Sequence, residues 1–124
     1  MDSYAVVREG YPSYAHAWRQ YVMPHYRATL TGRRGNYYMK RIDAAGAVVI
    51  TPSGAEKRLG FHAFQAVYNL LLAKGDDVTR STACAVGARG CFDEICLLLV
   101  YVPFIQFSEK PTPRLHLLPP STRR

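Results

Sequence analysis

Four histidines and three cysteines are the residues of this chain that could hold a metal ion: His16, His25, His62, His116, Cys84, Cys91 and Cys96. Structural zinc sites draw such residues from short C-x-x-C or H-x-x-x-H motifs, and neither motif occurs here. Four residues stand between Cys91 and Cys96, which on a helix turns the two thiols away from one shared face. We therefore expect no metal site and no cofactor.

Catalytic chemistry has no recognisable signature in the sequence either. No serine or cysteine stands in a strand-turn-helix elbow, as the nucleophile of a hydrolase would. The acidic residues do not form the clustered pattern with which nucleases hold Mg²⁺. The glycine-bracketed loop 32–36 lacks the Gly-x-x-x-x-Gly-Lys spacing of a phosphate cradle. We therefore expect a protein that is not an enzyme.

The charged side chains are mostly basic. Sixteen Lys and Arg against nine Asp and Glu give a formal net charge of +7, a balance that favours polyanionic partners. A basic surface that only keeps the protein in solution, or that meets an acidic protein, is the alternative interpretation. Residues 1–41 hold seven basic and two acidic residues and eight of the fifteen aromatic ones. Basic and aromatic side chains are thus concentrated in the first third of the chain.

A short helix and a small sheet are expected to carry this first part. Ser13 can cap a helix whose large apolar residues recur at helical spacing from Tyr14 to Val22, and Pro24 ends or kinks it. A further helical turn is predicted from His25 to Leu30. Residues 37–42 and 48–51 contain aromatic and β-branched residues with turn residues between them, and a third short strand is expected over 55–59 after the next turn, a pattern typical of a small antiparallel sheet.

The second half predicts three helices and a hairpin. Apolar residues at i, i+3, i+4 and i+7 indicate a helix over 61–74 that stops at Gly75. Asp76, Asp77 or Thr79 can cap a short helix over 80–86, and a third helix is expected from Cys91 to about Tyr101, although its apolar end could instead be a strand. Residues 104–107 and 114–117 are strand-like, and the polar, proline-containing segment 108–113 joins them.

This order of three helices and a hairpin resembles the winged helix-turn-helix family over about the C-terminal half. The segment 79–87, Thr-Arg-Ser-Thr-Ala-Cys-Ala-Val-Gly, is similar to the second helix of that family. The resemblance implies that the next helix reads bases in the major groove, with Arg89 in the turn or at the start of this helix, Arg80 on the preceding helix and Lys110 at the wing tip. Asp93 and Glu94 depart from the pattern, because carboxylates in the first turn of a reading helix repel phosphates.

The sequence therefore favours an α+β fold, with a small antiparallel sheet and a three-helix, winged helix-turn-helix-like C-terminal part. A single domain over 1–124 is expected, made of an aromatic, basic and helical N-terminal extension (1–36), a β-hairpin region (37–59), the winged-helix-like part (60–118) and a basic tail (119–124). No basic region followed by an apolar run opens the chain, and no apolar stretch is long enough for a bilayer. We expect a cytoplasmic protein with no membrane partner and with reduced thiols.

Binding of DNA or RNA with limited sequence specificity is the function that the sequence favours. The expected phosphate contacts come from Arg33, Arg34, Lys40, Arg41, Lys57, Arg58, Arg80, Arg89 and Lys110. This hypothesis requires a continuous basic patch that neighbouring carboxylates do not neutralise. The aromatic residues could instead stack unpaired bases, and the alternation of a strand places one of Tyr37 and Tyr38 on the outside.

The alternative function is that of a protein-interaction module, an inhibitor or accessory subunit of a larger nucleoprotein complex. Tyr, Trp and Arg are the residue types that dominate binding hot spots, so the same N-terminal third serves this hypothesis. Its expected partner interface consists of Tyr14, Trp18, Tyr37 and Tyr38. A position in the core or at a partner interface, rather than base stacking, is the interpretation that we favour for Trp18 and Tyr21.

Overall fold

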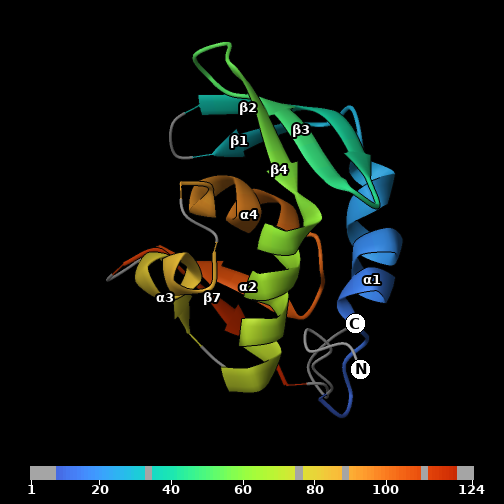
Figure 1. Ribbon diagram of the computed structural model, residues 1–124, viewed down its shortest axis with the longest axis vertical. Coiled ribbons are helices and arrows are strands. Elements are labelled where there is room, and N and C mark those ends of the chain that lie inside the picture. Colours follow the sequence, from blue (N-terminus) through green and yellow to red (C-terminus); the bar gives the residue numbers. More distant parts are fainter. Residues whose placement is uncertain (1–7, 33–34, 75–76, 88–89, 110–111, 120–124) are drawn as a thin grey trace.

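The computed structural model describes residues 8–32, 35–74, 77–87, 90–109 and 112–119. It has an α+β fold with two antiparallel sheets, as the sequence predicts. A four-stranded sheet lies at one end of the molecule and a smaller sheet lies toward the other, with helices α2 (Phe61–Lys74) and α4 (Phe92–Leu99) between them (Figure 1). One hydrophobic core draws residues from both sheets and from the helices.

The N-terminal helical segment winds irregularly. Ser13 accepts a hydrogen bond from the His16 backbone N–H and so caps α1 (Tyr14–Ala17). The chain continues through a π-helical stretch (Trp18–Val22) and a 3₁₀ turn (Met23–His25) that holds Pro24. Because proline removes a backbone donor, a helical ladder cannot pass this point unchanged. The predicted helical segment is confirmed, and around Pro24 it changes to a 3₁₀ turn that ends at His25.

The predicted helical turn from His25 to Leu30 is wrong, because β1 (Thr29–Gly32) is a strand. Arg27 has a φ of 69°, which a helix does not allow, and its backbone N–H donates to the Met39 carbonyl oxygen at 2.7 Å. Pairing with β2 therefore decides the conformation of residues 27–32. Because this pairing is not local, the pattern of neighbouring residues does not predict the strand. The N-terminal part consequently ends in the sheet rather than in a helical extension.

Four strands follow one another as an antiparallel meander in the order β1-β2-β3-β4. The last three are β2 (Gly35–Asp43), β3 (Gly46–Ile50) and β4 (Glu56–Gly60), which confirms the three predicted strands. The Asp43 carboxylate accepts a hydrogen bond from the Ala45 backbone N–H across the β2–β3 turn. Gly46 closes this turn at a φ of 133°, in the region that favours glycine.

The C-terminal half contains the three predicted helices. Helix α2 has the predicted bounds, and its apolar stripe, Phe64, Val67, Tyr68, Leu71 and Leu72, is buried. Thr79 caps α3 (Arg80–Ala85) in a reciprocal capping box with Thr82, and α4 follows. The apolar end of α4 is thus helical, not a strand.

The second sheet has the strand order β5-β7-β6. Strands β6 and β7 follow α4 in the sequence, whereas β5 lies between α2 and α3. The two predicted hairpin strands are β6 (Ile105–Ser108) and β7 (Arg114–Leu117). The sequence missed β5 (Val78–Thr79), which pairs with β7 and connects α2 to α3. A strand of two residues has no periodicity to detect, so its existence depends on the partner strand.

Candidate functional site

Helices α2 and α4 pack against the inner face of the four-stranded sheet, and its outer face is open among the described residues (Figure 1). Tyr37 and Met39 point inward and are 3% and 1% exposed, whereas Tyr38 between them is 40% exposed. This alternation across β2 is the one that the sequence predicts. Tyr38 is therefore the tyrosine of this pair that a ligand can reach.

A β-bulge in β2 adds two basic side chains to the surface. The register with β3 shifts between Met39 and Arg41, so that Lys40 is the additional residue. Without this bulge, strict alternation would turn Arg41 into the core. With it, both Lys40 and Arg41 are exposed and Ile42 returns to the inside. The bulge thus re-aims Arg41 toward solvent.

The neighbouring strands complete one patch on this outer face. Tyr38 pairs with Ile50, which pairs in turn with Glu56, and Arg41 and Arg58 flank Val48 from the two sides. Residues directly opposite one another in antiparallel strands lie on the same face. We call this set the sheet-face patch: Tyr38, Lys40, Arg41, Val48, Ile50, Glu56 and Arg58, of which Val48 is buried.

Carboxylates lie among the cations of the sheet-face patch. Glu56 lies 2.7 Å from Lys40 Nζ and 3.7 Å from Arg58 Nη2, and Asp43 lies 3.1 Å from Arg41 Nε. The hydrogen bond from Lys40 and the charges of Lys40, Arg58 and Arg41 lower the pKa of Glu56, although partial desolvation opposes them. Three cations thus face two carboxylates. The patch is basic, but it is not the continuous, uncompensated patch that the charge count alone predicts.

Lys57 and Arg80 serve the fold in this structure. Lys57 points inward from β4 and binds the Gly90 carbonyl oxygen at 2.6 Å and the buried carboxylate of Glu94 at 3.2 Å. Arg80 binds Asp93 at 2.8 Å, and its guanidinium carbon lies 5.4 Å from the centroid of the Phe92 ring. Both side chains therefore join structural elements, away from the sheet-face patch.

The remaining predicted basic residues, Arg33, Arg34, Arg89 and Lys110, lie outside the described residues. The sequence did not single out Tyr26 and Arg27, which precede β1. Tyr26 is 55% exposed, and the Arg27 guanidinium carbon lies 5.6 Å from its ring centroid. The adjacent aromatic and basic residues could have drawn attention to this pair, but the positive φ of Arg27 has no sequence signal.

Three of the four residues expected at a partner interface are buried, and this corrects the expectation for them. Tyr14, Trp18 and Tyr37 are 7%, 3% and 3% exposed. The Trp18 ring packs against Phe64 at a centroid distance of 4.5 Å, and its Nε1 donates to the Asp43 carbonyl oxygen at 2.8 Å. Large rings bury the most apolar area, so the core takes them first. Tyr38 is the residue of this set that is accessible.

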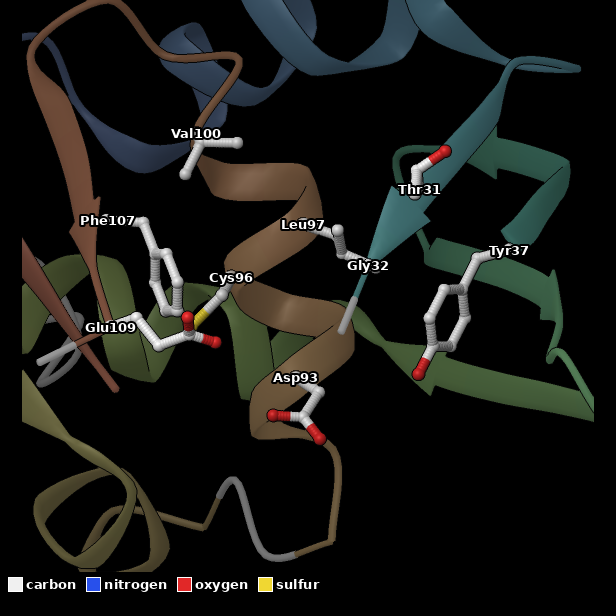
Figure 2. A pocket seen from close by; sticks show the side chains of 9 residues that line it. All are labelled: Thr31, Gly32, Tyr37, Asp93, Cys96, Leu97, Val100, Phe107 and Glu109. Atoms are coloured by element: carbon white, nitrogen blue, oxygen red, sulfur yellow. The ribbon is translucent and has the colours of Figure 1, made fainter. Parts of the chain in front are cut away.

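A groove on the exposed side of α4 is a second feature that the sequence did not reveal. Figure 2 shows its floor, formed by Asp93, Cys96 and Leu97 of α4 and by Val100 directly after this helix, and its flanks, formed by Thr31, Gly32 and Tyr37 on one side and Phe107 and Glu109 on the other. Its volume is about 430 Å³. A Cβ atom on Gly32 would lie 2.9 Å from the Tyr37 ring and 3.3 Å from the Leu97 side chain, so glycine keeps this side open.

Neither a metal cluster nor a membrane-spanning helix occurs among the described residues. In this part of the chain no three His, Cys, Asp or Glu side chains gather closely enough to hold a metal ion. None of its helices combines the length and apolar character needed to span a bilayer.

Comparison with known proteins gave no match to a protein-family model, to a curated protein or to a solved structure.

Proposed function

We propose that this protein binds single-stranded nucleic acid through the sheet-face patch. The observation that carries the proposal is the open outer face of the four-stranded sheet, on which an exposed tyrosine, Tyr38, lies among Lys40, Arg41 and Arg58. A sheet surface with an aromatic ring and neighbouring cations can stack a base and contact the adjoining phosphates. No metal or cofactor is needed for this.

The patch is not the continuous, unneutralised basic surface that the sequence hypothesis requires, so we base the proposal on the exposed ring of Tyr38 and on the weakness of exposed ion pairs. Exposed ion pairs contribute about 0 to 1 kcal/mol, whereas stacking of one base on an aromatic side chain contributes about 1 to 3 kcal/mol. The side chains of Lys40, Arg41 and Arg58 are 55%, 60% and 77% exposed. A phosphate can therefore replace Glu56 beside Lys40 and Arg58, or Asp43 beside Arg41, at small cost. The small surplus of charge favours modest affinity and little sequence preference.

The winged helix-turn-helix resemblance remains a proposal for the fold of residues 61–117. The order of α2, α3, α4 and the β6–β7 hairpin, and the capping of α3 by Thr79, support it. The outward side of α4, however, carries Asp93, Leu97 and Val100 rather than basic residues. Phosphates would be repelled by Asp93, so we assign nucleic-acid contact to the sheet and not to α4.

Fluorescence anisotropy with labelled dT20, U20 and a 20-base-pair duplex tests the proposed function. We expect the single strands to bind more tightly than the duplex, with a logarithmic salt slope of about −2 for three phosphate contacts. Tyr38→Ala should weaken binding about 5- to 100-fold through the lost stacking. Lys74→Ala, which removes an exposed cation at the end of α2, is the control and should leave affinity nearly unchanged.

A substitution of opposite sign sharpens this test. Glu56→Gln removes the carboxylate that Lys40 and Arg58 share, and it should therefore tighten single-strand binding about 2- to 5-fold. Lys40→Ala with Arg58→Ala should weaken binding and reduce the salt slope by about 1.4. Equal affinity of the native protein and Tyr38→Ala, together with no dependence on salt, would refute the proposal.

A further inference from the structure

The groove on α4 has the edge of a sheet along one side. β1 is an edge strand of the four-stranded sheet. Among the described residues it pairs with β2 on one side and with no strand on the other. The Thr31 hydroxyl donates to Asn36 Oδ1 on the outer face at 2.9 Å. The side chain of Thr31 thus points away from α4, and what Thr31 contributes to the groove is the edge of its strand.

The hydrogen-bond pattern of β1 turns peptide groups toward this edge. The Met39 backbone N–H donates to the Ala28 carbonyl oxygen at 2.8 Å, and Leu30 and Gly32 continue the same ladder opposite Tyr37 and Gly35. Bonded and non-bonded pairs alternate in an antiparallel ladder. The N–H and C=O groups of Thr29 and Thr31 therefore face away from β2, where another strand could pair with them.

The lining of the groove gives the chemistry of that strand. Leu97, Val100 and Phe107 offer apolar surface, and Val100 is 40% exposed. Among the described lining residues the charged ones are Asp93 and Glu109, both acidic, in a chain whose formal net charge is +7. Arg80 binds Oδ1 of Asp93, and a carboxylate has acceptor positions for a second cation. The groove thus complements an apolar segment that carries a positive charge.

We propose that an extended segment of a partner protein adds to the open edge of β1 and fills this groove. One side of the added strand would face the groove and enter between α4 and Phe107. The side chains on that side would be apolar, with one lysine or arginine among them. The main chain supplies hydrogen bonds in this mode of recognition, and the groove supplies selectivity. The site lies on the α4 side of the sheet, so it is separate from the sheet-face patch and does not depend on the proposed nucleic-acid binding.

Titration of the ¹⁵N-labelled protein with two capped heptapeptides tests the inference by NMR. In acetyl-TVTKTVT-amide the two valines and the lysine share one side of the strand, and acetyl-TVTETVT-amide replaces that lysine by glutamate. We expect the lysine peptide to shift the amides of Thr29, Thr31, Leu97, Val100 and Phe107, with a Kd below about 1 mM. The glutamate peptide should bind at least about tenfold more weakly. General attraction to a basic protein would give the opposite preference.

Two exposed valines provide matched variants. Val100→Lys places a positive charge in the groove and should weaken the lysine peptide at least about tenfold, whereas Val86→Lys, at an equally exposed valine outside the groove, should not. Unchanged amide spectra elsewhere would show that both variants fold. Equal binding of the two peptides, shifts confined to the sheet-face patch, or equal effects of the two variants would overturn the inference. Groove shifts that depend on protein concentration without peptide would also overturn it, since a second copy would then be the occupant.

Discussion

Lys57 on β4 binds the carboxylate of Glu94 on α4 at 3.2 Å, and this ion pair joins the four-stranded sheet to the C-terminal half of the molecule. Glu94 is 7% exposed, and the Lys57 ammonium also donates to the Gly90 carbonyl oxygen. A cation that the sequence offers as a phosphate ligand therefore neutralises a buried carboxylate. The two residues are 37 positions apart, so no local pattern relates them.

Removal of the Lys57 ammonium should destabilise the protein. Lys57→Met leaves the buried Glu94 without its cation, and we expect the free energy of unfolding to fall by about 2 to 3 kcal/mol in urea titrations. Lys40→Met, which breaks an exposed pair with Glu56, should cost less than about 0.5 kcal/mol. The double variant Lys57→Met with Glu94→Met should recover most of the loss. Equal effects at Lys57 and Lys40 would contradict a structural role for the buried pair.

Tyr14 should govern part of the stability at alkaline pH. Its hydroxyl is buried and has no hydrogen-bond partner among the described residues, and burial raises its pKa well above the usual value near 10. Folding therefore favours the neutral phenol, and the associated stability is complete below pH 10 and is lost as the pH rises through the folded-state pKa.

The matching substitution is Tyr14→Phe, which removes the buried hydroxyl. We expect it to stabilise the protein by about 1 kcal/mol at pH 7, because an unsatisfied buried polar group is lost. Above pH 10 its advantage should grow by up to about 1.4 kcal/mol per pH unit. Thermal unfolding at pH 7, 9, 10.5 and 11 measures this, with Tyr26→Phe at an exposed ring as the control. An advantage that does not change with pH would contradict the burial of an ionisable hydroxyl.

Gly46 should tolerate no side chain. It has a φ of 133°, and a Cβ atom there would lie 2.0 Å from the Leu59 carbonyl oxygen on β4. Gly46→Ala should therefore cost more than about 3 kcal/mol, measured by urea unfolding. Gly54→Ala, at a φ of 90° with open space around it, should cost about 1 kcal/mol, and Gly60→Ala less than about 0.5 kcal/mol. A similar loss at all three positions would refute the steric explanation.

The three cysteines should differ in their reaction with iodoacetamide. None of them forms a disulfide, and burial is the main cause that raises the pKa of both Cys91 and Cys96. The thiolate is the reactive form, so these two thiols should react slowly in the folded protein. Cys84 is half-buried and should be modified first. Mass spectrometry at pH 8 should find one rapid addition that Cys84→Ser abolishes, and three additions in denaturant.

Local sequence patterns were sufficient for much of the fold. The stripe from Phe64 to Leu72 gives α2 its predicted bounds, and Thr79 caps α3 because a hydroxyl at that position can accept a backbone N–H. Strand β1 was missed because its conformation depends on pairing with β2 and on the positive φ of Arg27. Those determinants are not local, so hydrophobic periodicity does not report them.

The candidate site was less predictable than the fold. The exposure of Tyr38 follows from simple alternation along a strand, but the bulge that exposes Arg41 has no sequence signature here. Residue types also did not distinguish a core ring from a surface ring, so Tyr14 and Trp18 were expected at an interface. The carboxylate partner of each cation depends on the tertiary fold. Composition therefore indicated the sign of the surface charge but not its arrangement.

The walls of the groove come from distant parts of the chain, Thr31 and Gly32 from its N-terminal half and Phe107 and Glu109 from its C-terminal half. An occupant can consequently bind only where the two halves of the molecule have docked, and it has no site on the unfolded chain. Mass action then links recognition to conformational stability: a ligand at one hundred times its Kd adds about 2.7 kcal/mol to the folded state. A partner of this kind would raise the melting temperature of the protein and protect its first strand from hydrogen exchange.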